Sequence, residues 1–348
     1  RGGYFQLLSF FEMLLTLLAR CQLALTERRW AREQARLRCH LQLHDDGAWC
    51  LPSGRGGGKR RIQYVAGVDI SFFADAGHHG DPRACAALIV FEVDVELPKC
   101  EVVWEAFHFV TMNEPYIAGF LAFRELPAFQ ALFSRFRQER PDLELDVVMV
   151  DGNGVLHPRG FGSASHVGVV CGFRTIGIGK NLHNVDGLSK QGVKDIVASL
   201  DQGGHAPLVG SSGRVWGAAL LPLPRKPAAG KAFAKQQPKN PVFVSCGHRI
   251  ALDTAVELTS LLCIGARVPE PVRQADIRSR EEVRRVLAAE AQGKDLEAPG
   301  APATRQLESL HWKCAGAALL VLTVAATLFT ASGLRHGVGR GRLRYGGV

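Results

Sequence analysis

The sequence has no pair of cysteines at C-x-x-C spacing, although its 348 residues include nine cysteines. Without such a pair we do not expect a zinc ribbon or zinc finger. The number of cysteines is odd, and several lie inside apolar runs, so a disulfide framework is not indicated either. We expect buried, reduced thiols, which are typical of cytosolic or nuclear proteins.

A phosphate-binding loop with the spacing G-x-x-x-x-G-K-[ST] is also absent. The glycine-rich basic run PSGRGGGKRR at 52–61 lacks that spacing, and we interpret it as a flexible linker. Acidic residues are fewer than basic ones, 33 against 42, which gives a formal net charge of +9. This excess suits a nucleic acid or an anionic membrane, although basic tails account for part of it.

Charge-free apolar runs are concentrated near the two ends. Residues 314–334 carry no charge and are long enough to span a bilayer, so we expect either a membrane segment or a divergent tail there. Residues 4–25 are apolar but contain Glu12 and Arg20, and no small-residue cleavage site follows them. We therefore divide the chain into an apolar extension (1–25), a globular domain (26–291), a linker (292–313) and an apolar segment with a basic tail (314–348).

Strand and helix patterns alternate between these ends. The expected strands are 62–72, 83–95, 101–111, 145–151, 175–179, 207–221 and 241–246. The expected helices are 26–43, 119–140, 163–171, 252–264 and 281–291. Short turns separate the first three strands, which indicates an antiparallel meander. This order predicts an α/β domain of the ribonuclease-H-like fold, a mixed central sheet whose antiparallel first three strands are flanked by helices.

Three carboxylates stand in or beside apolar segments of this pattern. Asp69 lies within YVAGVDISF, Glu125 within GFLAFRELP, and Asp151 within VVMVDGNG. A charge at the end of an apolar strand is costly unless it is paired, yet a turn-capping role is the simpler explanation of each acid alone. Their joint occurrence on an α/β scaffold indicates Mg²⁺-assisted phosphodiester chemistry.

Seven motifs occur in order between residues 30 and 276: VAGVDISF, PYIAGFLAFRE, VDGNGVLHPRGFG, SHVGV, IGIGKNL, VSCGHRI and PEPVRQAD. In these motifs the sequence resembles the endonuclease V family, nucleases that act on deaminated purines. The resemblance implies a monomeric endonuclease that uses Mg²⁺, with Mn²⁺ as a substitute. It implies cleavage of inosine-containing single-stranded RNA, or of deaminated DNA, at the second phosphodiester 3′ to the inosine. The products would carry 5′-phosphate and 3′-hydroxyl ends.

The resemblance also assigns roles to the chemically active residues. Asp69 and Asp151 would be metal ligands, and Glu125 would be a third acid at the metal that orients water. Lys180 would face the scissile phosphate, and His248 would act on the attacking water or on phosphate. From the residues alone, a solvated lysine and a capping histidine are the simpler interpretations.

A wedge and a base pocket follow from the same resemblance. Pro115, Tyr116 and Ile117 would separate the lesion from its neighbour, whereas a hydrophobic staple for the next helix is the alternative. The residues implied to form the pocket are Gly119, Leu121, His157, Gly162 and Gly179. Glycines there would let backbone groups approach a base closely. His166 is expected to pack beneath the site.

Two other functions remain open at this point, a catalytically silent inosine-RNA binding protein and a membrane-tethered scaffold. We expect a cytoplasmic location, or a nuclear or nucleolar one. If residues 314–334 form an anchor, the domain should face the cytosol, where its RNA substrate would be.

Overall fold

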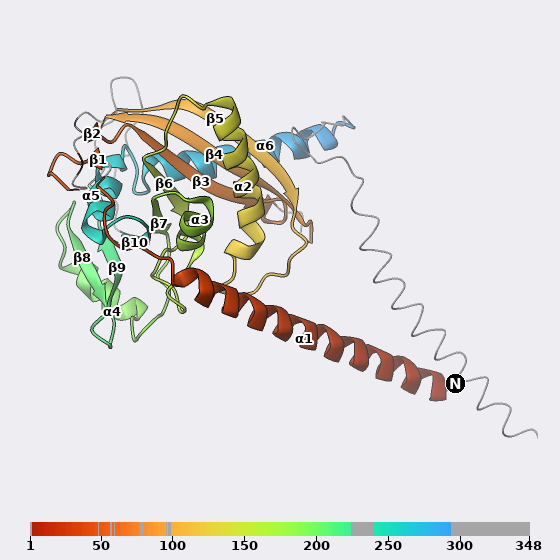
Figure 1. Ribbon diagram of the computed structural model, residues 1–348. Helices are drawn as coiled ribbons and strands as arrows, with labels where there is room; N and C mark the ends of the chain where they lie inside the picture. Colours follow the sequence, from red (N-terminus) through yellow and green to blue (C-terminus); the bar gives the residue numbers. More distant parts are fainter. Residues whose placement is uncertain are drawn as a thin grey trace, which may run out of the picture. The chain divides into compact units, whose positions relative to one another are not determined.

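The computed structural model describes residues 2–47, 49–55, 58, 60–76, 80–94, 96, 99–223 and 240–293 (Figure 1). These residues belong to one compact unit, Arg1–Gly300. The apolar segment predicted at 314–334 lies outside the described residues, so it stays a prediction. The same holds for the domain boundaries that depend on it.

An eight-stranded mixed sheet forms the centre of this unit, in the order β5-β4-β3-β6-β7-β10-β9-β8. Strands β3, β4 and β5 are antiparallel neighbours, whereas β6 and β7 run parallel to β3. Strands β10, β9 and β8 continue the sheet in antiparallel fashion. The bounds are β3 Tyr64–Phe72, β4 Arg83–Asp94, β5 Lys99–Thr111, β6 Val147–Asp151, β7 Thr175–Gly179, β8 His205–Val209, β9 Val215–Leu220 and β10 Val242–His248. The predicted α/β class, mixed sheet and antiparallel first three strands are confirmed.

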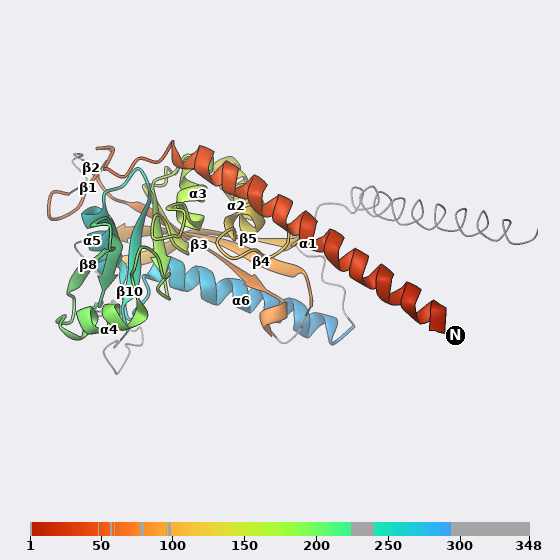
Figure 2. The ribbon, with the colours of Figure 1, turned by 90° about the horizontal axis from the view of Figure 1, so that it is seen from below.

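Six α-helices accompany the sheet in the described part of the chain: α1 Gly2–Arg38, α2 Ala122–Glu139, α3 Ser163–Cys171, α4 Lys190–Ala198, α5 Leu252–Leu262 and α6 Glu270–Glu290. Helices α2 and α3 pack on one face, where Phe129, Leu132 and Phe133 are buried. Helices α5 and α6 cover the other face. Figure 2 shows α6 on the opposite side of the sheet from α2 and α3. Short elements complete the fold: β1 Trp49–Cys50, β2 Arg60–Arg61 and the 3₁₀-helix Ala74–Ala76.

Four parts of the fold differ from the sequence prediction. Helix α1 does not begin at Thr26 but continues back to Gly2. Helix α6 begins at Glu270, because prolines are tolerated in the first turn of a helix, where their missing N–H has no partner to lose. The strand predicted at 207–221 is a hairpin of β8 and β9, with Gly213 in the left-handed conformation that its turn requires. Helix α4 was not predicted; its first turn is capped by Ser189, whose hydroxyl accepts the N–H of Gly192.

Apolar side chains in the first half of α1, including Met13, Leu15 and Leu18, are exposed. None of the described helices combines the length and apolar content that a bilayer-spanning helix needs. The eight described cysteines are all free thiols. Cys85, Cys100, Cys246 and Cys263 are buried as predicted, but Cys21 and Cys39 are exposed.

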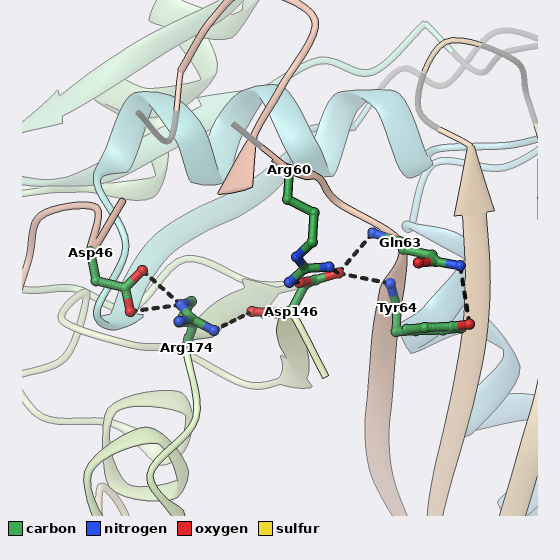
Figure 3. Close-up of polar contacts among 6 residues, drawn as sticks. All are labelled: Asp46, Arg60, Gln63, Tyr64, Asp146 and Arg174. Carbon is green, nitrogen blue, oxygen red and sulfur yellow. Dashed lines mark hydrogen bonds and ion pairs between the residues drawn. The ribbon is translucent and has the colours of Figure 1, made fainter. Parts of the chain in front are cut away.

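A buried carboxylate holds the starts of β3 and β6 together (Figure 3). Asp146, immediately before β6, is completely buried. Its carboxylate accepts the backbone N–H groups of Gln63 at 2.7 Å and Tyr64 at 2.9 Å, and it forms an ion pair with Arg60. Its backbone oxygen accepts from Arg174, whose guanidinium is paired with Asp46. These contacts set the parallel register of β3 and β6, the two strands that carry Asp69 and Asp151.

Replacing Asp146 by alanine is expected to destabilise the domain, because the substitution leaves Arg60 and two partly buried backbone N–H groups without their acceptor. Each unsatisfied buried donor costs about 1–3 kcal/mol. Asp142→Ala is the matched control, since its pair with Arg140 is exposed and such pairs contribute roughly 0–1 kcal/mol. Urea unfolding measures both free energies, and equal losses would contradict the role assigned to Asp146.

Candidate active site

Three functional side chains lie at the adjacent ends of β3, β6 and β7. The parallel register of β3 and β6 places Asp69 level with Asp151. Asp151 pairs with Ile178 of β7, two residues before Lys180. Because alternate strand residues point to the same face, all three side chains lie on the face that α6 covers. The structure therefore brings together three of the five residues predicted to be catalytic.

Helix α6 contributes a further carboxylate, Asp276, which the sequence interpretation did not assign. One of its oxygens lies 3.4 Å from Nζ of Lys180, and the other forms an ion pair with Arg280 at 2.8 Å. The helix can approach β3 this closely because residue 67 is glycine. A Cβ at Gly67 would lie 2.0 Å from the carbonyl oxygen of Pro271. Asp276 is the last residue of the PEPVRQAD motif, so this motif could have identified it from the sequence.

One lysine is surrounded by three carboxylates in this cluster. Nζ of Lys180 donates to Asp151 at 2.5 Å. Burial, and next the charge of Asp151, raises the pKa of Asp69 well above its usual value. Burial also raises the pKa of Asp151, against the opposing effect of Lys180. Burial disfavours the Lys180 cation, but the charges of Asp151, Asp69 and Asp276 outweigh it and raise the pKa of the ammonium. The cluster thus holds more buried negative charge than Lys180 can neutralise.

Glu125, the third predicted acid, lies in the first turn of α2, on the other side of the sheet from α6. It is only 4% exposed, and burial followed by the charge of Asp151 raises its pKa to about 8. A carboxyl group with this pKa carries a proton over much of the neutral range and can exchange it with a nearby water.

The donor set of this cluster fits a divalent cation. Carboxylate oxygens are the preferred ligands of Mg²⁺ and Mn²⁺, and a cation would relieve the repulsion that raises the pKa values of Asp69 and Asp151. Among the described residues, no group of three His, Cys, Asp or Glu side chains stands in a metal-holding arrangement. Nζ of Lys180 lies between Asp151 and Asp276, so these two acids reach one ion only if the lysine moves aside.

A cavity of about 130 Å³ opens beside the cluster. Five of the residues predicted to bind substrate line it: Tyr116, Gly119, Leu121, His157 and Gly162. Gly152 and Asn153, which directly follow Asp151, also line it. His157 is buried, and desolvation, followed by the charge of Arg159, lowers its pKa to about 4, so the imidazole is neutral at pH 7. The predicted pocket residues thus converge on one small cavity at the end of β6.

Other residues of this region were missed or lie behind the cavity. Gln34 of α1, Ser163 of α3 and His183 line it without having been predicted, because they come from segments far apart in the sequence. Gly179 lies behind the cavity, where an added Cβ would come within 2.7 Å of Oδ1 of Asn153. His166 packs between the rings of Phe123 and Phe161, as predicted, and burial lowers its pKa to about 4.

The predicted wedge lies at the rim of this cavity. Tyr116 is 68% exposed, Pro115 is exposed, and Ile117 is half-buried. The guanidinium of Arg124 lies 5.8 Å from the centre of the Tyr116 ring. A hydrophobic staple would bury this ring against the helix, so the exposure of Tyr116 favours a surface available to a partner.

The structure does not bring His248 to the cluster. Strand β10 is antiparallel to β7, and His248 pairs with Thr175, the first residue of β7. Thr175 lies three positions before Ile178, which is the β7 partner of Asp151. His248 is therefore displaced from Asp151 by about 10 Å along the strands. Nδ1 of His248 accepts the backbone N–H of Gln42. In this structure His248 therefore holds the segment that follows α1, and its catalytic role stays a prediction.

Comparisons with known proteins agree with this geometry. The sequence model of the endonuclease V family matches residues 55–277. Mouse endonuclease V is 44% identical over 76% of this chain and 73% of its own, and human endonuclease V is 41% identical over 79% and 86%. A crystal structure of the human catalytic domain superposes with a TM-score of 0.65, at 42% identity, over 76% of this chain and 98% of its own. Endonuclease V of Ciona intestinalis, in complex with a 24mer DNA containing an inosine followed by a ribo-adenosine, gives a TM-score of 0.61 at 28% identity, over 75% and 99%.

Mg²⁺ is expected to raise the melting temperature of the protein, and Asp151→Asn is expected to remove most of that increase. An ion at 100 times its dissociation constant stabilises a folded protein by about 2.7 kcal/mol, and the substitution removes a charged ligand. The readout is the Mg²⁺-induced shift, because the substitution also changes the stability without the ion. Asp195→Asn on the exposed face of α4 is the control. An undiminished shift in Asp151→Asn would place the ion elsewhere.

Proposed function

The chain belongs to the endonuclease V family of nucleases, and we propose that it cleaves inosine-containing single-stranded RNA with the help of a divalent cation. Cleavage falls at the second phosphodiester 3′ to the inosine. We also assign the domain to the ribonuclease-H-like fold, because an antiparallel meander followed by the parallel strands β6 and β7 is the strand order of that fold.

The observation that carries this proposal is the direct connection between the cavity and the acidic cluster. Asp151 belongs to the cluster, and the next two residues, Gly152 and Asn153, line the cavity. A strand whose base enters the cavity therefore carries its nearby phosphates past the carboxylates and Lys180.

The cavity is suited to a single extruded base. Glycine, alanine and serine residues form part of its lining, with Leu121 as an apolar surface and the neutral His157 as a polar one. Oδ1 of Asn153 is buried and has no hydrogen-bond partner within the described residues. Leaving a buried acceptor unpaired costs about 1–3 kcal/mol, which a donor on a bound base or a shift of the amide would recover. These features favour hydrogen-bonding recognition of a purine over purely apolar binding.

The exposed ring of Tyr116 has the position that a wedge requires. An aromatic side chain at the rim can stack on the base next to the extruded one and fill the space it leaves. Arg124 lies beside the ring and adds a positive charge near the strand. Stacking is independent of sequence, so it allows the cavity alone to decide which base is accepted.

Hydrolysis then follows from the chemistry of the cluster. A water attacks phosphorus, the new P–O bond forms as the bond to the 3′ oxygen breaks, and a proton passes to that oxygen, leaving 5′-phosphate and 3′-hydroxyl ends. Glu125 orients the water and takes part in its proton transfer. Lys180, released from Asp151, contacts the scissile phosphate. Asp69, Asp151 and the nearby Asp276 would hold Mg²⁺ or Mn²⁺, which would supply electrostatic stabilisation of the charge that develops on the phosphate.

The preference for RNA rests on the comparison with relatives. The ligand of the Ciona intestinalis enzyme carries a ribo-adenosine directly after its inosine. A site that accepts a 2′-hydroxyl at this position can recognise RNA through it. Deaminated DNA is the alternative substrate, and the assay below includes it.

Cleavage of a 5′-labelled RNA with one inosine tests the proposal directly. The wild-type protein is expected to give one product that ends one nucleotide 3′ of the inosine, with Mg²⁺ and not with EDTA. Asp151→Asn should lose cleavage by at least about 10³-fold and retain most of the binding, because it removes charge stabilisation in the transition state and leaves the cavity intact. The same RNA with adenosine, and the inosine DNA, are the control substrates. Absence of cleavage of both inosine strands by the wild type would sink the proposal.

Tyr116→Ala is expected to weaken binding of inosine-containing single strands by about 1–3 kcal/mol, the loss of one stacked base. Fluorescence anisotropy on the Asp151→Asn background measures it without cleavage. Tyr64→Ala would disturb the sheet, so Tyr116→Phe is the better control: it keeps the ring and should keep the affinity. Unchanged binding in Tyr116→Ala would leave the ring without a role as a wedge.

A further inference from the structure

One wall of the cavity comes from a helix that lies outside the matched family region of residues 55–277. Gln34 projects from α1, is only 2% exposed, and lines the cavity. Its Nε2 donates to the carbonyl oxygens of Gly119 at 3.0 Å and Phe161 at 3.1 Å. Its Oε1 accepts the Nε–H of Arg159. Both N–H groups and the oxygen of this amide therefore bond to residues in or next to the cavity lining.

The carbonyl of Gly119 is the point where these interactions meet. It accepts from Gln34 and from Arg159 at 2.6 Å, and His157 also hydrogen-bonds this backbone. Gly119 has a φ of +80°, a conformation that non-glycine residues rarely adopt. An added Cβ there would lie 2.6 Å from the guanidinium of Arg159. The wall at Gly119 is therefore fixed from several sides and has no room to recede.

Helix α1 is firmly attached where Gln34 needs it. One turn before Gln34, Trp30 is 4% exposed and stacks on Phe123 with ring centres 4.9 Å apart. It also contacts the ring of Phe120. Gly119 and Phe120 are consecutive residues of the segment that leads from the predicted wedge to α2. The same part of α1 therefore contacts this segment twice, through the ring of Trp30 and through the amide of Gln34. The position of Gln34 is thus set by packing that does not involve the cavity itself.

We propose that Gln34 is a positioning residue that sets the width of the base cavity and so excludes guanine, which is hypoxanthine with one added amino group. The inference rests on the proposed function. Gln34 joins Gly119, which lines the cavity, to Phe161, which directly precedes the lining residue Gly162. Arg159 of the second segment also donates to the carbonyl of Gly119, so Gln34 supplies one of the hydrogen-bonded links between the two walls. A cavity rejects a slightly larger base only if its walls cannot move apart. Without the amide, both carbonyls lose a donor, and Arg159 is left to hold the wall at Gly119 without the link to Phe161, so the walls are less tightly held together.

The alternative is that Gln34 only attaches α1 to the domain. Both roles would lower the thermal stability on substitution, so stability does not distinguish them. The selectivity between inosine and guanosine does, because it depends on the width of the cavity and not on the amount of folded protein. An attachment role would lower the cleavage of all substrates by the same factor.

The test uses the full chain with Gln34→Met, which keeps the length and volume of the side chain and removes all three hydrogen bonds. Gln34→Glu keeps the acceptor for Arg159 and removes both donors. Gln22→Met, at an exposed position of the same helix, is the matched control. For each protein, kcat/KM is measured on two RNAs that differ only in carrying inosine or guanosine at one position, and melting temperatures are recorded in parallel.

We expect the inosine-to-guanosine ratio of kcat/KM to fall roughly tenfold or more in Gln34→Met and Gln34→Glu, a typical cost of losing one close contact in a specificity pocket. The fall should come from a higher KM for inosine and a gain on guanosine, with Gln22→Met unchanged. Suppose that the wild type prefers inosine and that the folded Gln34 variants show the same inosine-to-guanosine ratio of kcat/KM. That result overturns this inference and leaves the proposed function intact. If Gln34→Met does not fold, the ratio in Gln34→Glu decides in the same way. A wild type that cleaves neither RNA overturns the proposed function, and this inference with it.

Discussion

The parallel register of β3 and β6 is the constraint on which the active site depends, and Asp146 maintains it. Asp146 accepts two N–H groups at the start of β3 and lies at the start of β6. A slip of one residue would turn the alternation of side chains over and send Asp69 to the opposite face of the sheet from Asp151. The carboxylate that aligns the strands thus lies at one end of the sheet, and those that carry chemistry lie at the other. Stability and activity are separated in space but linked through the same two strands.

The cost of this alignment is electrostatic. It places buried acids next to one another, and their raised pKa values report both burial and mutual repulsion. Lys180 offsets part of this repulsion without neutralising it. A site of this kind is unfavourable for folding and suited to a divalent cation, because the same uncompensated charge that destabilises the free protein supplies the binding energy. Apolar clusters on both faces of the sheet stabilise the fold and offset the repulsion between these buried acids.

Recognition is built from the opposite side of the sheet. The turn after β6 supplies the floor of the cavity, the segment before α2 supplies the rim with Tyr116, and α1 supplies Gln34. These segments are joined by contacts to a few backbone carbonyls, above all that of Gly119. Backbone groups hold their positions more firmly than long side chains, so a cavity walled by them can distinguish bases that differ by a single substituent. The selectivity for one base over another would then depend on the contacts that hold the cavity-forming segments together.

The amino-acid sequence by itself determined most of the strands of the sheet and the two acids, Asp69 and Asp151, that they carry. Apolar runs ending in Asp69 and Asp151 predict buried strands that deliver carboxylates, and these predictions need only local patterns. Three other placements were decided by tertiary structure. His248 lies far from the cluster because β10 runs antiparallel to β7. Asp276 reaches it because α6 closes onto a glycine of β3, and Gln34 reaches the cavity because α1 packs beside α2. Periodicity and composition describe one segment at a time, whereas strand direction and helix packing depend on pairs of segments, so which residues meet is settled only when the chain has folded.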